Sequence, residues 1–200
     1  MILSLVSLKG GVGKTTSAMY LAACAVEDEM RPIVLDADEE ASALSWASLA
    51  NSRNQPLPWQ VLAPDRNSLA KKARALEKEG YCVFIDTPPN NREVLTVAGM
   101  VSDLVIVPVS PSGVEMDRLK NTLALLENVE AARGSLTYAV LLTQFDGRQL
   151  LAAQATEALH GFSVFNSRIR DLARYKTFGG MPSYMTEYRQ AWDEIKEAVS

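Results

Sequence analysis

The chain has 200 residues, of which 48% are hydrophobic and 22% charged, a balance typical of a soluble globular protein with one large core. The net charge of −4 and an isoelectric point near 5.1 argue against a broadly basic nucleic-acid binder, although a local basic patch stays possible. No apolar run approaches the roughly 20 residues that cross a bilayer, and Met1–Gly11 does not resemble a signal peptide. We therefore expect a cytoplasmic protein.

Short apolar runs rich in β-branched residues alternate with longer helical patterns along the whole chain. The expected strands are Ile2–Ser7, Pro32–Asp36, Trp59–Leu62, Cys82–Asp86, Leu104–Val109, Thr137–Thr143 and Ser163–Phe165. The clearest expected helices are Lys14–Glu29, Asn67–Glu79, Val114–Ala131, Gln149–His160 and Tyr184–Val199. The alternation predicts right-handed βαβ units and a doubly wound α/β fold, with a mostly parallel sheet flanked by helices. We expect a single domain over residues 1–200.

A glycine-rich turn connects the first expected strand to the first expected helix. It reads Leu8-Lys9-Gly10-Gly11-Val12-Gly13-Lys14-Thr15-Thr16. Glycines let the backbone curl so that successive N–H groups point at an anion, and the helix that follows adds its own N–H groups and positive dipole end. This is the context of a phosphate-binding loop (P-loop), in which Lys14 reaches the β- and γ-phosphates and the Thr15 hydroxyl holds Mg²⁺. A chance lysine beside a glycine turn does not explain why strand, turn, helix and Lys-Thr coincide.

Carboxylates end two other expected strands at the same edge of the sheet. Asp36 and Asp38, at i and i+2, share a face beyond the carboxyl end of their strand. Asp86 ends another apolar strand and can take Mg²⁺, usually through water, because it faces the P-loop across the strand ends. The alternative for Asp36 and Asp38 is that they cap the helix that follows them.

The loop departs from the common P-loop at two positions. Leu8 stands where a glycine is usual, and Lys9 is a second lysine within the loop. This Lys-Gly-Gly-x-Gly-Lys-Thr-Thr form is the deviant Walker A motif and resembles the ParA/MinD family of ATPases, especially the short ParA-type plasmid partition proteins. In that family the extra lysine contacts the nucleotide of the opposite subunit. The resemblance implies a homodimer with two ATPs at its interface, and a solvated surface charge is the alternative for Lys9.

The same resemblance implies roles for the carboxylates. Asp38 matches the second member of the family's Asp-x-Asp motif, which orients the attacking water, and Asp36 would lie near Mg²⁺ and Thr15. Asp86-Thr87-Pro88-Pro89 matches the family's Walker B region, and 87–90 would be a switch loop that senses the γ-phosphate. The family usually continues Pro-Gln-Gly after Asp-x-Asp, whereas Glu39-Glu40-Ala41 stands here, which leaves the shape of this loop and the rate of hydrolysis open.

Matches in the second half of the chain are weaker. Val107–Ser112 resembles the family's strand that ends in a proline-containing turn near the nucleotide. Gln144 stands where relatives often carry Asn, so no adenine contact is assigned. Preference for ATP over GTP comes from the resemblance, and no guanine-reading Asn-Lys-x-Asp is present.

Basic residues concentrate in Ser167–Lys176. The candidates for DNA contact are Arg168, Arg170, Arg174 and Lys176. In short ParA-type proteins a comparable region helps the ATP-bound dimer hold DNA without sequence preference, and dimerisation that doubles a weak phosphate-binding patch makes affinity depend on ATP. The alternative is that these arginines pair with Asp171 and neighbouring acids on a solvated helix face.

The last expected helix is amphipathic, with Tyr188, Trp192, Ile195 and Val199 at helical spacing. A membrane-targeting helix, as MinD proteins carry, is disfavoured by the acids Glu187, Asp193, Glu194 and Glu197. We expect this helix to pack on the core. Cys24 and Cys82 lie in apolar runs without Cys-x-x-Cys spacing, so both are expected in the core rather than in a metal site.

The function implied by the resemblance is that of an ATPase that positions or segregates cargo, such as a plasmid or chromosome. ATP and Mg²⁺ would drive dimerisation and non-specific DNA binding, which associates the protein with the nucleoid. Slow hydrolysis, stimulated by a small centromere-binding adaptor, would release both. The alternatives are a MinD-like positioning regulator and a P-loop small-molecule ligase or kinase, which would need a substrate pocket of its own and no lysine that crosses a dimer.

Overall fold

The computed structural model describes residues 1–110, 113–145, 159, 161–176, 178–183 and 185–200, without the side chains of 113–118 and 176. Seven strands form one sheet in the order β3-β2-β4-β1-β5-β6-β7. Their bounds are β1 Ile2–Leu5, β2 Pro32–Asp36, β3 Gln60–Leu62, β4 Cys82–Asp86, β5 Leu104–Val109, β6 Tyr138–Phe145 and β7 Val164–Arg170. Every pair is parallel, which confirms the predicted doubly wound α/β fold.

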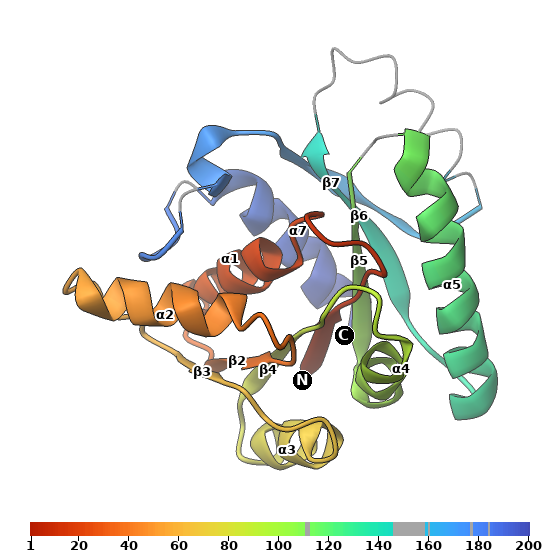
Figure 1. Cartoon of the computed structure of the whole chain (residues 1–200), viewed down its shortest axis with the longest axis horizontal. Coiled ribbons are helices and arrows are strands. Elements are labelled where there is room, and N and C mark those ends of the chain that lie inside the picture. Colours follow the sequence, from red (N-terminus) through yellow and green to blue (C-terminus); the bar gives the residue numbers. More distant parts are fainter. Residues whose placement is uncertain (111–112, 146–158, 160, 177, 184) are drawn as a thin grey trace.

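Helices cover both faces of the sheet (Figure 1). They are α1 Lys14–Glu27, α2 Ser42–Ser52, α3 Leu69–Lys78, α4 Arg92–Val101, α5 Gly113–Arg133 and α7 Thr186–Ala198, with a 3₁₀ turn, η1, at Ala173–Lys176. One core cluster joins the sheet to α1, α2 and α7, and a second joins it to α3, α4 and α5. Successive strand residues alternate between the two clusters, as Phe84 and Ile85 do, because side chains on a strand point to opposite faces. Strands buried on both faces are therefore nearly continuous in apolar residues.

A proline lies within the central strand β5. Ile106 accepts a hydrogen bond from Val6 on the β1 side, whereas Val105 donates to Thr137 on the β6 side. Pro108, two residues beyond Ile106, therefore faces the β1 side, where β1 has already ended at Leu5. The missing N–H of Pro108 therefore ends the ladder with β1 at this point and does not interrupt it, which explains how this strand tolerates proline.

Three expectations differ from the observed elements. Helices α2 and α4 were not among those expected, and β7 extends through Arg170, well beyond the expected end at Phe165. The basic segment is therefore a strand followed by a 3₁₀ turn, so the helix face that the alternative interpretation assumed is not present. The expected helix Gln149–His160 lies almost entirely outside the described residues.

Helix α7 packs its apolar face into the core, as expected. Tyr188, Trp192 and Ile195 are fully buried, and Trp192 lies 6.0 Å from Phe84, measured between ring centroids. Among the helices that the structure describes, none is both long and apolar enough to cross a bilayer. Cys24 and the other cysteine are free and buried, in agreement with the predicted core positions.

Candidate nucleotide-binding site

Two glycines give the P-loop its shape. The loop follows β1 and ends where α1 begins at Lys14. Gly11 and Gly13 have φ angles of +76° and +85°, in the left-handed region that side chains other than glycine rarely adopt. Gly13 is also the residue at which the first helical hydrogen bond of α1 starts, because its carbonyl accepts from the N–H of Ser17 at 2.8 Å.

Three side chains hold the carbonyl groups of this loop. Lys14 Nζ donates to the carbonyl of Lys9, Gln144 Nε2 to that of Gly11, and Thr143 Oγ1 to that of Val12, each at 2.8 Å. Two of these donors come from the end of β6, which lies far away in sequence. The carbonyls of the loop are thus held both from within it and from β6, which fixes its conformation.

The N–H groups of the loop are available to an anion. From Gly10 to Thr16, no backbone N–H donates a hydrogen bond to another residue that the structure describes. Nothing lies within 4 Å of the point where a Cβ of Gly11 would stand. Successive N–H groups without partners at the start of a helix form a cradle for phosphate. The residues present therefore fit a nucleotide phosphate chain.

Asp86 and Thr15 meet beneath the loop. Thr15 Oγ1 donates to Asp86 Oδ2 at 2.6 Å, and Asp86 Oδ1 is buried without a hydrogen-bond partner among the described residues. Burial raises the pKa of Asp86 to about 7, although the hydrogen bond from Thr15 and the charge of Lys14 oppose the shift. A buried carboxylate oxygen with no partner beside a threonine hydroxyl fits a divalent cation. No cluster of three His, Cys, Asp or Glu occurs among the described residues, so Mg²⁺ here would depend on phosphate oxygens as well.

Lys14 is buried among acidic groups. Its side chain is only 6% exposed, and burial lowers its pKa, while Asp86, Asp38 and Glu40 partly offset the shift. The lysine is therefore held at the centre of the acids that line the loop.

The carboxylate that ends β2 and the one that follows it form different contacts. Asp36 lies opposite Asp86 in the sheet register, and its two oxygens accept from the N–H groups of Asp38 at 3.2 Å and Leu44 at 3.0 Å. Asp36 thus caps the first turn of α2, so the alternative interpretation is confirmed for this residue. Asp38 is half-exposed, and one of its oxygens accepts from the N–H of Glu40 at 3.1 Å.

A hollow of about 280 Å³ opens over the P-loop. Lys14, Thr15 and Asp38 line it, and so do two aromatic residues that the sequence did not indicate, Trp46 of α2 and Phe178. Their ring centroids lie 5.1 Å apart. Trp46 Nε1 donates to the carbonyl of Gly180 at 2.8 Å, which fixes the loop that carries Phe178 against α2. Lys9 is half-buried beside this hollow but does not line it.

The segment after β4 adjoins the P-loop. Thr87 Oγ1 donates to the carbonyl of Leu5 at 2.7 Å, and the N–H of Asn90 donates to the carbonyl of Leu8 at 3.2 Å. Asn90 has a φ angle of +55°, and Pro89 lines the hollow. The candidate switch loop is thus tied to the end of β1 and to the first residue of the P-loop.

This geometry agrees with the comparison of the sequence with known families. The family described as the CobQ/CobB/MinD/ParA nucleotide binding domain matches residues 3–178. The chain belongs to this family. Within it, the chain is 31% identical to the maintenance of carboxysome distribution protein A of Gloeobacter kilaueensis, over 84% of this chain and 76% of that protein. It is 30% identical to the chromosome-partitioning ATPase Soj of Thermus thermophilus, over 78% of this chain and 74% of that protein. The predicted relationship to ParA-type ATPases is confirmed.

Solved structures show the same fold. Apo McdA of Cyanothece aligns with a TM-score of 0.79 at 18% identity, over 100% of this chain and 99% of that one. Cobyrinic acid a,c-diamide synthase from Mycobacterium smegmatis, solved with an ATP analogue and magnesium, also aligns with a TM-score of 0.79 at 18% identity, over 98% of this chain and 94% of that one. The family fold thus serves both positioning proteins and a synthase.

The candidate DNA-contacting residues of this family member lie on β7 and η1. Arg168 and Arg170 are exposed on the same side of β7, and Arg174 is exposed on η1. The Arg170 side chain forms an ion pair with Glu187 of α7, and the Arg168 guanidinium lies 4.8 Å from the centroid of the Phe145 ring. The side chain of Lys176 lies outside the described residues. The alternative interpretation, in which these arginines pair with acids, thus holds for Arg170, whose partner is Glu187.

Proposed function

We propose that this chain is a ParA-type ATPase that positions or segregates cargo. In this proposal it binds MgATP, forms a homodimer, holds DNA without sequence preference while ATP-bound, and is reset by slow hydrolysis that a partner protein stimulates. The observation that supports it best is the unpaired Asp86 oxygen beside Thr15, at the base of a loop whose N–H groups have no partners among the described residues and which carries a second lysine.

The residues of the P-loop would hold the nucleotide. The N–H groups of residues 10–16 would bind the phosphates, Lys14 would pair with them, and Thr15 and Asp86 would bind Mg²⁺. Mg²⁺, when bound, neutralises charge on the phosphate oxygens. Lys14 donates to the Lys9 carbonyl in this structure, so it has a hydrogen bond to exchange for a phosphate oxygen.

Asp38 and Lys9 would act on hydrolysis. Asp38 lines the hollow with Lys14, where its free oxygen can accept a proton from a water molecule and orient it. A lone half-exposed carboxylate is a weak base, which supports a slow intrinsic rate. Lys9 does not line the hollow of its own chain, which is compatible with a role across a dimer.

The cargo can be of more than one kind. The named relatives include a carboxysome distribution protein and a chromosome-partitioning ATPase. In both cases the proposed cycle is the same, because ATP controls dimerisation and dimerisation controls affinity for DNA. The protein would be associated with the nucleoid while ATP-bound and released after hydrolysis, with a small centromere- or cargo-binding adaptor as the stimulating partner.

Co-sedimentation with plasmid DNA tests this proposal. The wild type is compared with MgATP, with MgADP and without nucleotide, and we expect DNA retention only with MgATP. Lys9→Ala should lose retention because the second lysine no longer reaches across the dimer. Lys78→Ala, which removes an exposed lysine from α3, is the matched control and should behave as the wild type.

Two outcomes would count against the proposal. Retention that is independent of nucleotide would point to a constitutive DNA binder, and absence of retention under every condition would favour a small-molecule ligase or kinase on the same fold. ATP hydrolysis and sedimentation measured on the same samples separate loss of the site from loss of DNA binding.

A further inference from the structure

Helix α3 carries a concentration of positive charge on an acidic protein. Lys71, Arg74 and Lys78 recur at i, i+3 and i+7, which places them on one outer face, and Lys72 lies beside them. All four side chains are exposed, and none forms an ion pair or hydrogen bond with another residue that the structure describes. Glu77, the one acid of this helix, pairs with the amino group of Met1 at 3.2 Å. The nucleotide site proposed above uses none of these cations.

A groove runs along this helix at the edge of the sheet. It has a volume of about 580 Å³ and lies between α3 and the chain that leaves β3. Leu62, Pro64 and Ala75 supply apolar lining, and Lys71 and Lys72 line it as well. Asp65 also lines the groove, but Ser68 occupies its carboxylate through the backbone N–H at 3.1 Å and the hydroxyl at 2.8 Å. The groove is therefore apolar within, and of the three charged side chains that line it two are positive and one is negative.

We propose that this groove is a docking site for an acidic segment of a partner protein. Apolar side chains of the segment would enter between Leu62 and Ala75, and its carboxylates would pair with Lys71 and Lys72. Charge complementarity favours an acidic occupant because Lys71 and Lys72 outnumber the one carboxylate of the lining, and no described acid forms an ion pair with either lysine. The apolar lining favours a peptide over DNA, because a phosphate backbone has no groups to fill such a groove.

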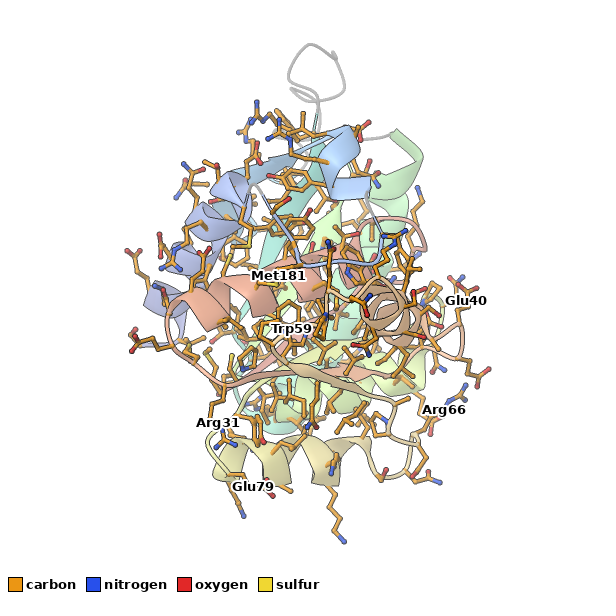
Figure 2. The ribbon with its side chains drawn as sticks, turned by 90° about the vertical axis from the view of Figure 1, so that its left-hand side faces the viewer. Arg31, Glu40, Trp59, Arg66, Glu79 and Met181 are labelled. Atoms are coloured by element: carbon orange, nitrogen blue, oxygen red, sulfur yellow. The ribbon has the colours of Figure 1, made fainter. Side chains whose placement is uncertain are left out.

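The groove lies close to the loop that carries Asp38. Arg66, which precedes α3, forms an ion pair with Glu39 of that loop. Figure 2 shows Arg66 and Glu40 on the same side of the molecule, while Glu79 marks the opposite end of α3. A segment seated in the groove can thus reach the loop after β2, and a consequence for hydrolysis would rest on the function proposed above. Docking itself does not depend on that function.

Fluorescence anisotropy tests the proposal with the whole chain. The probe is a short fluorescein-labelled peptide of alternating Glu and Leu, with the same peptide carrying Gln in place of Glu as its control. We expect saturable binding of the acidic peptide that weakens as salt is raised. The double variant Lys71→Glu/Lys72→Glu should bind about tenfold more weakly, since it replaces two attractive charges with repulsive ones.

Two single variants distinguish the groove from general attraction. Ala75→Gln obstructs the groove but keeps both lysines, and should also bind about tenfold more weakly because the leucine side chains are excluded. Lys78→Glu reverses a single charge on the same helix away from the groove, and should stay within about twofold of the wild type. Far-UV circular dichroism and the unfolding midpoint show that each variant is folded.

Several results would overturn the proposal. Equal losses in Lys78→Glu and Lys71→Glu/Lys72→Glu, or unchanged binding in Ala75→Gln, would mean that the peptide responds only to charge. Equal affinity for the Gln peptide would show that ion pairs with the lysines do not contribute to binding. Binding of a short DNA duplex that depends on Lys71 and Lys72, without binding of the acidic peptide, would reassign this surface to nucleic acid.

Discussion

Gln144 is a residue whose conformation is explained by its contact with the P-loop. It has a φ angle of +50°, which costs free energy for a side chain other than glycine, and its amide donates to the Gly11 carbonyl. Thr143, its neighbour, holds Val12 in the same way. The end of β6 therefore positions the P-loop. This role was not predicted from the sequence, in which position 144 is notable only because relatives often carry Asn there.

Replacing Gln144 with alanine should weaken ATP binding. Loss of one hydrogen bond to the loop carbonyl corresponds to about 1 kcal/mol, or about fivefold in affinity for ATP. Titration with a fluorescent ATP analogue measures the effect, and Gln60→Ala, an exposed residue at the edge of the sheet, is the control. Unchanged affinity in Gln144→Ala would show that the loop holds its shape without this contact.

The residues of the phosphate site differ in how far the sequence can reveal them. Lys14 and Thr15 were predictable because the P-loop fixes their spacing from one glycine turn, and Asp86 because it ends an apolar strand. Trp46 and Phe178 were not, because their place in the hollow depends on a loop held against α2 by hydrogen bonds between distant residues. Only tertiary contacts bring such residues to the site.

At the level of elements, the parallel strands were the most predictable part. β2, β4 and β5 match their expected bounds, because strands buried on both faces are continuous apolar runs with clear ends. Helices α2 and α4 were missed because they lack the alternation of charged and apolar residues that marks α3, and α4 is marked mainly by Asn91, which accepts from the N–H of Val94 at 3.1 Å. The edge strand β7 alternates exposed polar and buried apolar residues through Arg170, and the prediction ended it at Phe165 because the exposed residues beyond that point are largely basic.

Asp28, which follows the last residue of α1, connects that helix to α7 through hydrogen bonds and ion pairs. Its carboxylate accepts from Trp192 Nε1 at 2.9 Å and from Lys196 Nζ at 2.7 Å, and it pairs with Arg189. We expect Asp28→Ala to destabilise the protein by about 2–3 kcal/mol, because the indole N–H of the fully buried Trp192 loses its acceptor. Urea unfolding measures this loss, and Asp193→Ala, an exposed partner of the same cations, should cost less than about 1 kcal/mol.

The contribution of Asp28 should depend on pH in a definite direction. Partial burial raises its pKa, but hydrogen bonds from Lys196, Trp192 and Arg189 outweigh that effect and lower the pKa from 3.8 to about 2. A lowered pKa in the folded state means that the stabilisation is present above pH 4 and is lost as the pH falls toward 2. The stability difference between the wild type and Asp28→Ala should therefore shrink over that range, and a constant difference would contradict the role of the charge.

At the scale of the whole molecule, the order of the strands explains why the candidate site residues lie together. β1, β2 and β4 are neighbours in one parallel sheet, so the P-loop, the Asp38 loop and Asp86 all emerge at the same edge. The basic helix α3 follows β3 and packs with α4 on the face of the sheet opposite α1, the helix that begins at the P-loop (Figure 1). An acidic protein can thus present cations on a defined surface.

This arrangement also predicts how nucleotide changes the stability of the molecule. A ligand that binds only the folded state at about one hundred times its Kd stabilises by about 2.7 kcal/mol, which for a domain of this size raises Tm by about 5–10 °C. Both MgADP and MgATP should produce such a shift in the wild type. Lys14→Ala should lose it in both cases, since that lysine is buried at the centre of the phosphate site.

Dimerisation adds a dependence on protein concentration that separates the two nucleotides. Because association is a mass-action effect, Tm with MgATP should rise when the protein is concentrated tenfold, whereas Tm with MgADP should not. Lys9→Ala should keep the shift caused by each nucleotide but lose the dependence on protein concentration, since it retains its own phosphate site and lacks only the contact across the dimer. Differential scanning fluorimetry over a series of protein concentrations measures both effects. A Tm with MgATP that stays constant over this series in the wild type would contradict ATP-dependent dimerisation, and with it the role of Lys9 across the dimer.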